Sequence, residues 1–305
     1  MLASTLSRVV RVALVAVAAG LLVPAAIVNA EDAAPDANPT AAQASVVAKT
    51  DAAKHEVAAA TEAPSAPPAE SAQDELSRRA TDPTASPLTF GFINDVTTSY
   101  RDLEDGTPID ENGYLLKFQP VLPFKAWGVA NILRMTVPYQ VSGPGPEGLE
   151  DLTIFDMVIL PQSWGRIGIG AVGSFAAATS DVSAHASAGP AIGVVVPVSK
   201  KLNLGLFNQN LFGNDVSISQ IQPIAAYQLG SGWSLSLGDL QWPYDWKRGE
   251  FVSMPIGVQL GKVQRVAGQP MRFAVNPQYD LKDLPGASRF KVSFTVTLLL
   301  PEGKK

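Results

Sequence analysis

The chain has 305 residues, of which 46% are hydrophobic, and its formal net charge is −5. It contains no cysteine, so disulfide frameworks, thiolate metal centres, cysteine nucleophiles and lipidated cysteines are excluded. The mild acidic balance lacks the clustered positive charge of a protein that binds nucleic acid, and the length suits one large domain or two ordinary ones.

The first thirty residues have the composition of a secretory signal peptide. Arg8 and Arg11 precede the apolar run VALVAVAAGLLVPAAIV, and residues 28–30 (Val-Asn-Ala) end it at a cleavage-type position. We therefore predict a signal peptide over residues 1–30. The alternative is an uncleaved anchor helix, which Pro24 and the short apolar run disfavour.

Residues 31–83 are rich in Ala, Pro, Ser, Thr and Glu and poor in large apolar side chains. Burial of such a segment cannot offset the entropy lost when the chain is ordered. We therefore predict a flexible periplasmic linker over these residues.

From Ser86 onward the sequence changes to short β-type runs separated by Gly, Pro, Asn and Asp. The twelve predicted strands span residues 87–98, 113–123, 128–139, 150–160, 166–176, 186–197, 202–211, 217–228, 232–241, 250–261, 270–280 and 288–300. An even number is what single-chain bacterial outer-membrane barrels require. Several runs contain proline, which cannot donate a hydrogen bond to a ladder, so we expect bulges or shortened ladders there.

The last predicted strand shows the clearest alternation, because successive side chains of a strand point to opposite faces. One face is apolar, with Phe290, Val292, Phe294, Val296, Leu298 and Leu300, and the other is polar, with Arg289, Lys291, Ser293, Thr295 and Thr297. A membrane-spanning strand needs about 9–11 residues with its apolar side toward lipid. We predict that the apolar face contacts lipid and the polar face lines a lumen.

The connections between strands separate by charge. If the first strand rises from the periplasm, the periplasmic connections contain bases and no acids, whereas the external connections carry the acids. External carboxylates can bind divalent cations shared with lipopolysaccharide. Tryptophan and tyrosine lie near strand ends, as in the interfacial girdles of barrels, although aromatic residues can also simply flank turns.

These patterns predict an all-β fold: an antiparallel up-and-down transmembrane β-barrel of about 12 strands over residues 84–301, with residues 302–305 as a periplasmic tail. The predicted location is the outer membrane, with outer-membrane lipid and lipopolysaccharide as partners.

Several segments resemble a known family. They are LKFQPVLPF at 116–124, ILRMTVPYQ at 132–140, GLEDLTIFDMVILP at 148–161, GAVGSFAAATSD at 170–181, SAGPAIGVVVP at 187–197, QIQPIAAYQLGSGWSL at 220–235 and the block 252–281. The chain resembles the bacterial outer-membrane proteins grouped as "meta-pathway of phenol degradation" transporter-like proteins, often mislabelled neuromedin U. The resemblance implies an outer-membrane barrel involved in the passage of hydrophobic or aromatic compounds.

The candidate site residues are polar side chains on the predicted lumen faces: Lys117, Gln119, Arg134, Asp156, Gln220, Gln222, Arg272, Asn276, Gln278, Arg289 and Lys291. They fit either the lining of a selective channel or a plug of salt bridges, since buried charges are retained when they are paired. The excess of bases over the single acid favours anionic solutes.

The sequence offers little for catalysis or metal binding. Its two histidines, His55 and His185, lie in the predicted linker and in a predicted external loop, so we predict no metal, no cofactor and no catalytic residue. An outer-membrane hydrolase would need His185 with Ser183 or Ser187, but the low-complexity surroundings favour a solvated loop.

Three functions remain. The first is a non-enzymatic channel or transporter for small solutes, hydrophobic or aromatic ones included. The second is a structural or envelope-interaction barrel, and the third is a hydrolase.

Overall fold

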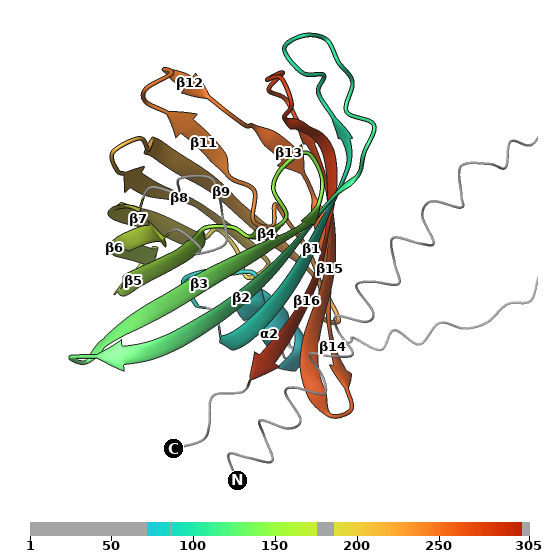
Figure 1. Cartoon of the computed structure of the whole chain (residues 1–305). Helices are drawn as coiled ribbons and strands as arrows, with labels where there is room; N and C mark the ends of the chain where they lie inside the picture. The colour runs from blue at the N-terminus through green and yellow to red at the C-terminus, as the bar shows by residue number, and fades with distance from the viewer. Residues whose placement is uncertain (1–71, 86, 176–185, 301–305) are drawn as a thin grey trace, which may run out of the picture.

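The structure is a computed structural model that describes residues 72–85, 87–175 and 186–300. Within these ranges one antiparallel sheet closes on itself as a 12-strand barrel (Figure 1). The predicted signal peptide, residues 31–71 of the predicted linker and the predicted tail lie outside the described residues.

The described chain begins with the helix α2 (Ala72–Ala80). The long strands are β1 (Leu88–Tyr100), β2 (Gly113–Ala126), β3 (Val129–Ser142), β5 (Leu152–Gln162), β6 (Gly165–Phe175), β7 (Ser187–Pro197), β8 (Leu202–Phe212), β9 (Ser217–Gly230), β14 (Gln259–Val266), β15 (Gln269–Asp280) and β16 (Ser288–Leu300). The short strands are β4 (Gly148–Leu149), β10 (Trp233–Ser236), β11 (Trp242–Asp245), β12 (Glu250–Phe251) and β13 (Pro255–Gly257). The first long strand, β1, pairs with the last strand, β16.

The ninth and tenth predicted strands, 232–241 and 250–261, are each broken in the structure. β10 pairs with β9 and β14, whereas β11 pairs with β9 and β12, and β13 pairs with β15. Gly238, with φ +68°, turns the chain after β10, and Pro255 has no N–H for a ladder. The other predicted strands agree with the structure to within a few residues.

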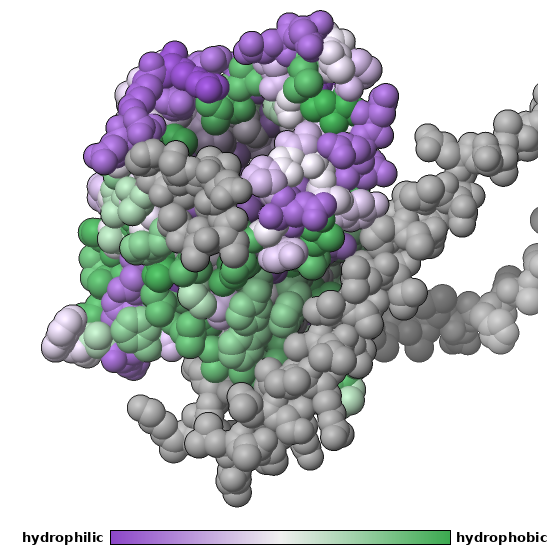
Figure 2. Space-filling model, viewed as in Figure 1, coloured by the Kyte–Doolittle hydropathy of each residue, from purple (hydrophilic) through white to green (hydrophobic). Residues whose placement is uncertain are grey.

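The outer wall of the barrel is apolar. Figure 2 shows hydrophobic side chains over the wall and hydrophilic ones above them, at the end that carries β12 in Figure 1. Ile169, Ile192 and Leu206 are about half exposed, which would be unfavourable over a large surface in water but is favourable against hydrocarbon. Trp127 and Trp164 are exposed at the turns between long strands, where the girdle prediction placed them.

Helix α2 lies within the lower part of the barrel and contacts β9, β10 and β14 (Figure 1). The Gly232 N–H donates to Asp74 Oδ1 (2.6 Å), and Gln228 Nε2 donates to Thr81 Oγ1 (3.0 Å). The prediction of a flexible linker is therefore wrong for residues 72–80, because the barrel wall supplies partners that the local composition does not reveal. In the described part of the chain, no helix is long and apolar enough to cross a membrane.

Candidate functional site

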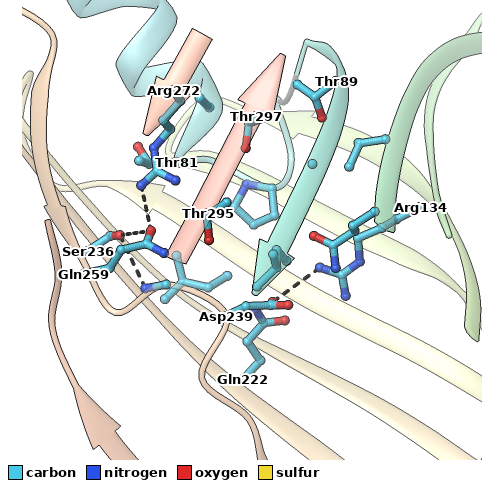
Figure 3. A pocket seen from close by; sticks show the side chains of 18 of the residues that line it. Thr81, Thr89, Arg134, Gln222, Ser236, Asp239, Gln259, Arg272, Thr295 and Thr297 are labelled. Atoms are coloured by element: carbon cyan, nitrogen blue, oxygen red, sulfur yellow. Dashed lines mark hydrogen bonds and ion pairs between the residues drawn. The ribbon is translucent and has the colours of Figure 1, made fainter. Parts of the chain in front are cut away.

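The barrel encloses a cavity of about 170 Å³ next to the C-terminal end of α2 (Figure 3). Its lining comprises apolar side chains from β3, β5, β8 and β9, polar side chains from β1, β14, β15 and β16, and a floor from the end of α2. The main lining residues are Ile132, Phe155, Phe207 and Ile224, then Thr89, Gln259, Arg272, Thr295 and Thr297, then Ala80, Thr81 and Pro83. The cavity thus has one apolar wall and one polar wall.

The apolar wall forms because alternate residues of β5 and β8 point inward. Phe155, Met157 and Phe207 are buried in one cluster, and the rings of Phe155 and Phe207 lie 6.4 Å apart. Glycines on the neighbouring strands make room for these side chains, since a Cβ on Gly193 of β7 would overlap the Phe207 ring. Large apolar side chains, for which the glycines leave space, therefore occupy this side of the lumen.

Arg134 reaches from β3 across the cavity to Asp239, which lies between β10 and β11 (Figure 3). The distance from Arg134 Nη1 to Asp239 Oδ1 is 3.5 Å, and Gln222 Nε2 donates to the same oxygen at 2.7 Å. The Arg134 guanidinium also lies 5.2 Å from the centre of the Phe155 ring. This ion pair spans the lumen at the level of the cavity.

A second ionic cluster surrounds Asp95 on β1, which is nearer the end of the barrel opposite α2. Lys117 Nζ lies 2.6 Å and Lys291 Nζ 3.7 Å from Asp95 Oδ2. Ser293 Oγ donates to Asp95 Oδ1 and accepts from Gln278 Nε2 at 3.2 Å. The Asp95 carboxylate therefore forms ion pairs with two lysines on the lumen side of the barrel wall.

The structure brings most of the predicted lumen residues inside the barrel. Gln119, Arg134, Gln222 and Arg272 line the cavity, and Lys117, Lys291 and Gln278 belong to the Asp95 cluster. Asn276 Nδ2 donates to Leu237 O at 3.3 Å, and Gln220 lies outside the cavity beside Gln209 in the ladder.

Two predicted lumen residues are misplaced. Asp156 is exposed on the outer face, because its neighbours Phe155 and Met157 are the residues of β5 that point inward. Arg289 is exposed at the rim of the barrel, next to the irregular pairing of Phe290 with Ser99.

Asp95, Asp239 and Gln259 were missed by the sequence analysis. Alternation with the outward residues Phe90 and Phe92 could have identified Asp95. Asp239 lies in a break between strands, where alternation gives no signal.

The segment after α2 is attached to the barrel wall by Asp82, which is 2% exposed. Its carboxylate pairs with Arg166 of β6 and accepts hydrogen bonds from the Thr84 N–H (2.9 Å) and the Thr84 hydroxyl (2.6 Å). Arg166 also donates to Thr84 Oγ1 at 3.1 Å. These contacts hold α2 below the cavity.

A wider vestibule of about 710 Å³ lies at the opposite end, lined in part by Tyr100, Lys117, Pro138 and Glu150. Partial desolvation by the vestibule walls raises the pKa of Glu150 above its ordinary value, with Lys117 opposing and Asp151 adding to the rise. Lys117 lines the vestibule and pairs with Asp95, so the Asp95 cluster borders the vestibule.

The residues considered for hydrolysis are mostly not described. His55, Ser183 and His185 lie outside the described residues, and Ser187 is buried at the start of β7. Among residues 72–85, 87–175 and 186–300, no three histidine or carboxylate side chains gather as they would around a metal ion.

Comparison with known proteins gives structural likenesses only. No protein-family model matches the chain, and no curated protein sequence matches it. The KdgM porin in complex with disordered oligogalacturonate is 8% identical, with a TM-score of 0.46 over 70% of this chain and 100% of that one. The COG4313 outer membrane channel from Pseudomonas putida F1 is 12% identical, with a TM-score of 0.49 over 70% of this chain and 96% of that one.

Outer membrane phospholipase A from Escherichia coli is 11% identical, with a TM-score of 0.40 over 74% of this chain and 97% of that one.

The closed barrel, its apolar outer wall and its exposed tryptophans lead to one assignment. The chain is an outer-membrane β-barrel.

Proposed function

We propose that the barrel is a channel for small solutes that have an apolar body. The observation that carries the proposal is the cavity inside the barrel, with its apolar wall of Ile132, Phe155, Phe207 and Ile224. Recognition sites for small molecules are mostly apolar with a few placed polar groups, and this cavity has that composition.

The arrangement corresponds to a closed channel. α2 and Thr81 lie below the cavity, and the Arg134–Asp239 pair crosses it. Passage then requires α2 to move, and the contacts of Asp82 with Arg166 and Thr84 set how readily it does so. Hydrophobic or aromatic solutes are the class that the sequence resemblance to the phenol-degradation transporter-like proteins suggests, and the apolar wall is compatible with them.

The test is single-channel recording of the refolded full-length chain in planar bilayers, with folding checked by heat-modifiable gel mobility. We expect a small, intermittent conductance that benzyl alcohol interrupts and that erythritol at the same concentration does not. Ile224→Thr should weaken the interruptions because it makes the apolar wall polar, whereas the matched Ile192→Thr on the lipid face should not. A folded barrel that never conducts would refute the channel.

A second candidate is a structural barrel without transport, its external acids contacting lipopolysaccharide. The paired charges of Arg134 with Asp239 and of Lys117 with Asp95 favour it, because such pairs also fit a permanently closed core. Bilayers that stay silent even when α2 is released by Asp82→Asn would support this function over the first.

A further inference from the structure

Arg272 differs from the other lumen bases. It points inward from β15 and is 6% exposed, yet in the described part of the chain no carboxylate forms an ion pair with it. Its Nη2 donates to the neutral Gln259 Oε1 at 2.6 Å, and its Nε is buried without a hydrogen-bond partner. Burying an arginine in this way is unfavourable unless something else neutralises the charge.

The wall is shaped around this guanidinium. A Cβ added to Gly261 would lie 2.7 Å from Arg272 Nη2 and 3.0 Å from its Cζ and Nε, so a larger residue there would displace the group. The hydroxyls of Thr81, Thr295 and Thr297 lie around the same side of the cavity (Figure 3). The missing side chain of Gly261 therefore leaves space for the guanidinium, and neutral polar groups lie around it.

The charge of the lumen near the cavity is also unbalanced. The inward-facing bases are Lys117, Lys291, Arg134 and Arg272, and the acids that pair with them are Asp95 and Asp239. Lys117 and Lys291 share one carboxylate and Arg134 has its own, so one surplus positive charge lies at the Asp95 cluster. The other is Arg272, the base for which the described residues supply no ion-pair partner, and it lies at the cavity.

We propose that the cavity binds a single-ring aromatic carboxylate, with the carboxylate on Arg272 and the ring against Phe155 and Phe207. Arginine presents a planar fork that matches a carboxylate bidentately, and the apolar wall lies across the cavity from it. The cavity of about 170 Å³ also suits the size, since a cavity of roughly 150 Å³ holds benzene. This inference rests on the proposed channel function and names its substrate class.

The probes are benzoate and its neutral isostere benzamide, added to the refolded full-length barrel. Isothermal titration in lipid nanodiscs should show benzoate binding at least about tenfold more tightly than benzamide, because only benzoate neutralises Arg272. Arg272→Gln should remove this preference, and Arg272→Lys should retain part of it. Arg265→Gln, near the exposed end of β14, is the matched control and should change nothing.

The outcomes separate this inference from the channel. Equal binding of benzoate and benzamide, or binding of neither, in a barrel that conducts would overturn the anionic specificity and leave the channel standing. A folded barrel that binds benzoate but never conducts would support the site and refute the channel. Should Arg272→Gln fail to fold, the comparison of the two probes on the unchanged chain and on Arg272→Lys still decides.

Discussion

Replacing Asp82 by Asn is expected to loosen α2 from the barrel and to increase the open fraction of the channel. Asp82 is the buried partner of Arg166 and accepts two further hydrogen bonds from Thr84. The asparagine keeps the shape of the side chain but removes its charge, so the contact with Arg166 is the one that weakens.

A hydrogen bond to a charged group contributes about 1.5–3 kcal/mol. The Arg166 side chain is 30% exposed, so solvent screens part of this, which leaves about 1–2 kcal/mol. A change of this size shifts the ratio of released to seated α2 by about 5–30-fold. The open probability in single-channel recordings should therefore rise by the same factor while openings remain rare.

The matched control is Glu75→Gln, which removes one carboxylate charge from α2 itself, at a residue paired within the helix with Arg78. It should leave the open probability close to that of the unchanged chain. If Asp82→Asn opens no more often than Glu75→Gln, and protease cleavage near residue 80 is no faster, α2 does not gate the lumen.

Three further predictions follow from other contacts. Asp239→Asn removes the acid opposite Arg134 and should shift the reversal potential in a KCl gradient toward chloride, whereas Asp283→Asn, at an exposed partner of Arg101, should shift it little. Glu150 has a raised pKa, so it is protonated at a higher pH than an ordinary glutamate. Anion selectivity should therefore increase as the pH falls through that pKa, and Glu150→Gln should show the acidic selectivity already at pH 7 and lose the pH response; an unchanged response would exclude Glu150 as its source. Phe294→Arg, at the middle of the lipid face of β16, should cost about 2–4 kcal/mol in urea unfolding from vesicles, and Leu300→Arg at the strand end about 0–1; equal costs would contradict the assigned membrane position.

Most of the barrel could be predicted from local alternation. The lumen side of β16 was predicted correctly because Thr295 and Thr297 alternate with large apolar residues, and both line the cavity. Asp156 was predicted wrongly because its strand is apolar on both faces, so polarity did not reveal which side points inward. The register with β3 and β6 decides this, and register depends on the neighbouring strands.

The site was less accessible to prediction than the fold. Individual bases such as Arg134, Lys117 and Arg272 could be assigned to the lumen, but their partners could not. Asp239 lies about a hundred residues from Arg134 in the chain and in a break between strands. Pairing therefore decides which charges are neutralised and which one, Arg272, is left to face the cavity.

The linear chain is enough to define an all-β barrel, because side-chain alternation, turn residues and strand-end tryptophans are local properties. Only closure of the barrel decides what the lumen contains. It brings α2 beneath the cavity, sets Phe155 and Phe207 opposite Arg272, and joins Asp82 to Arg166. These contacts link residues far apart in sequence, so they form only when the fold brings distant parts of the chain together.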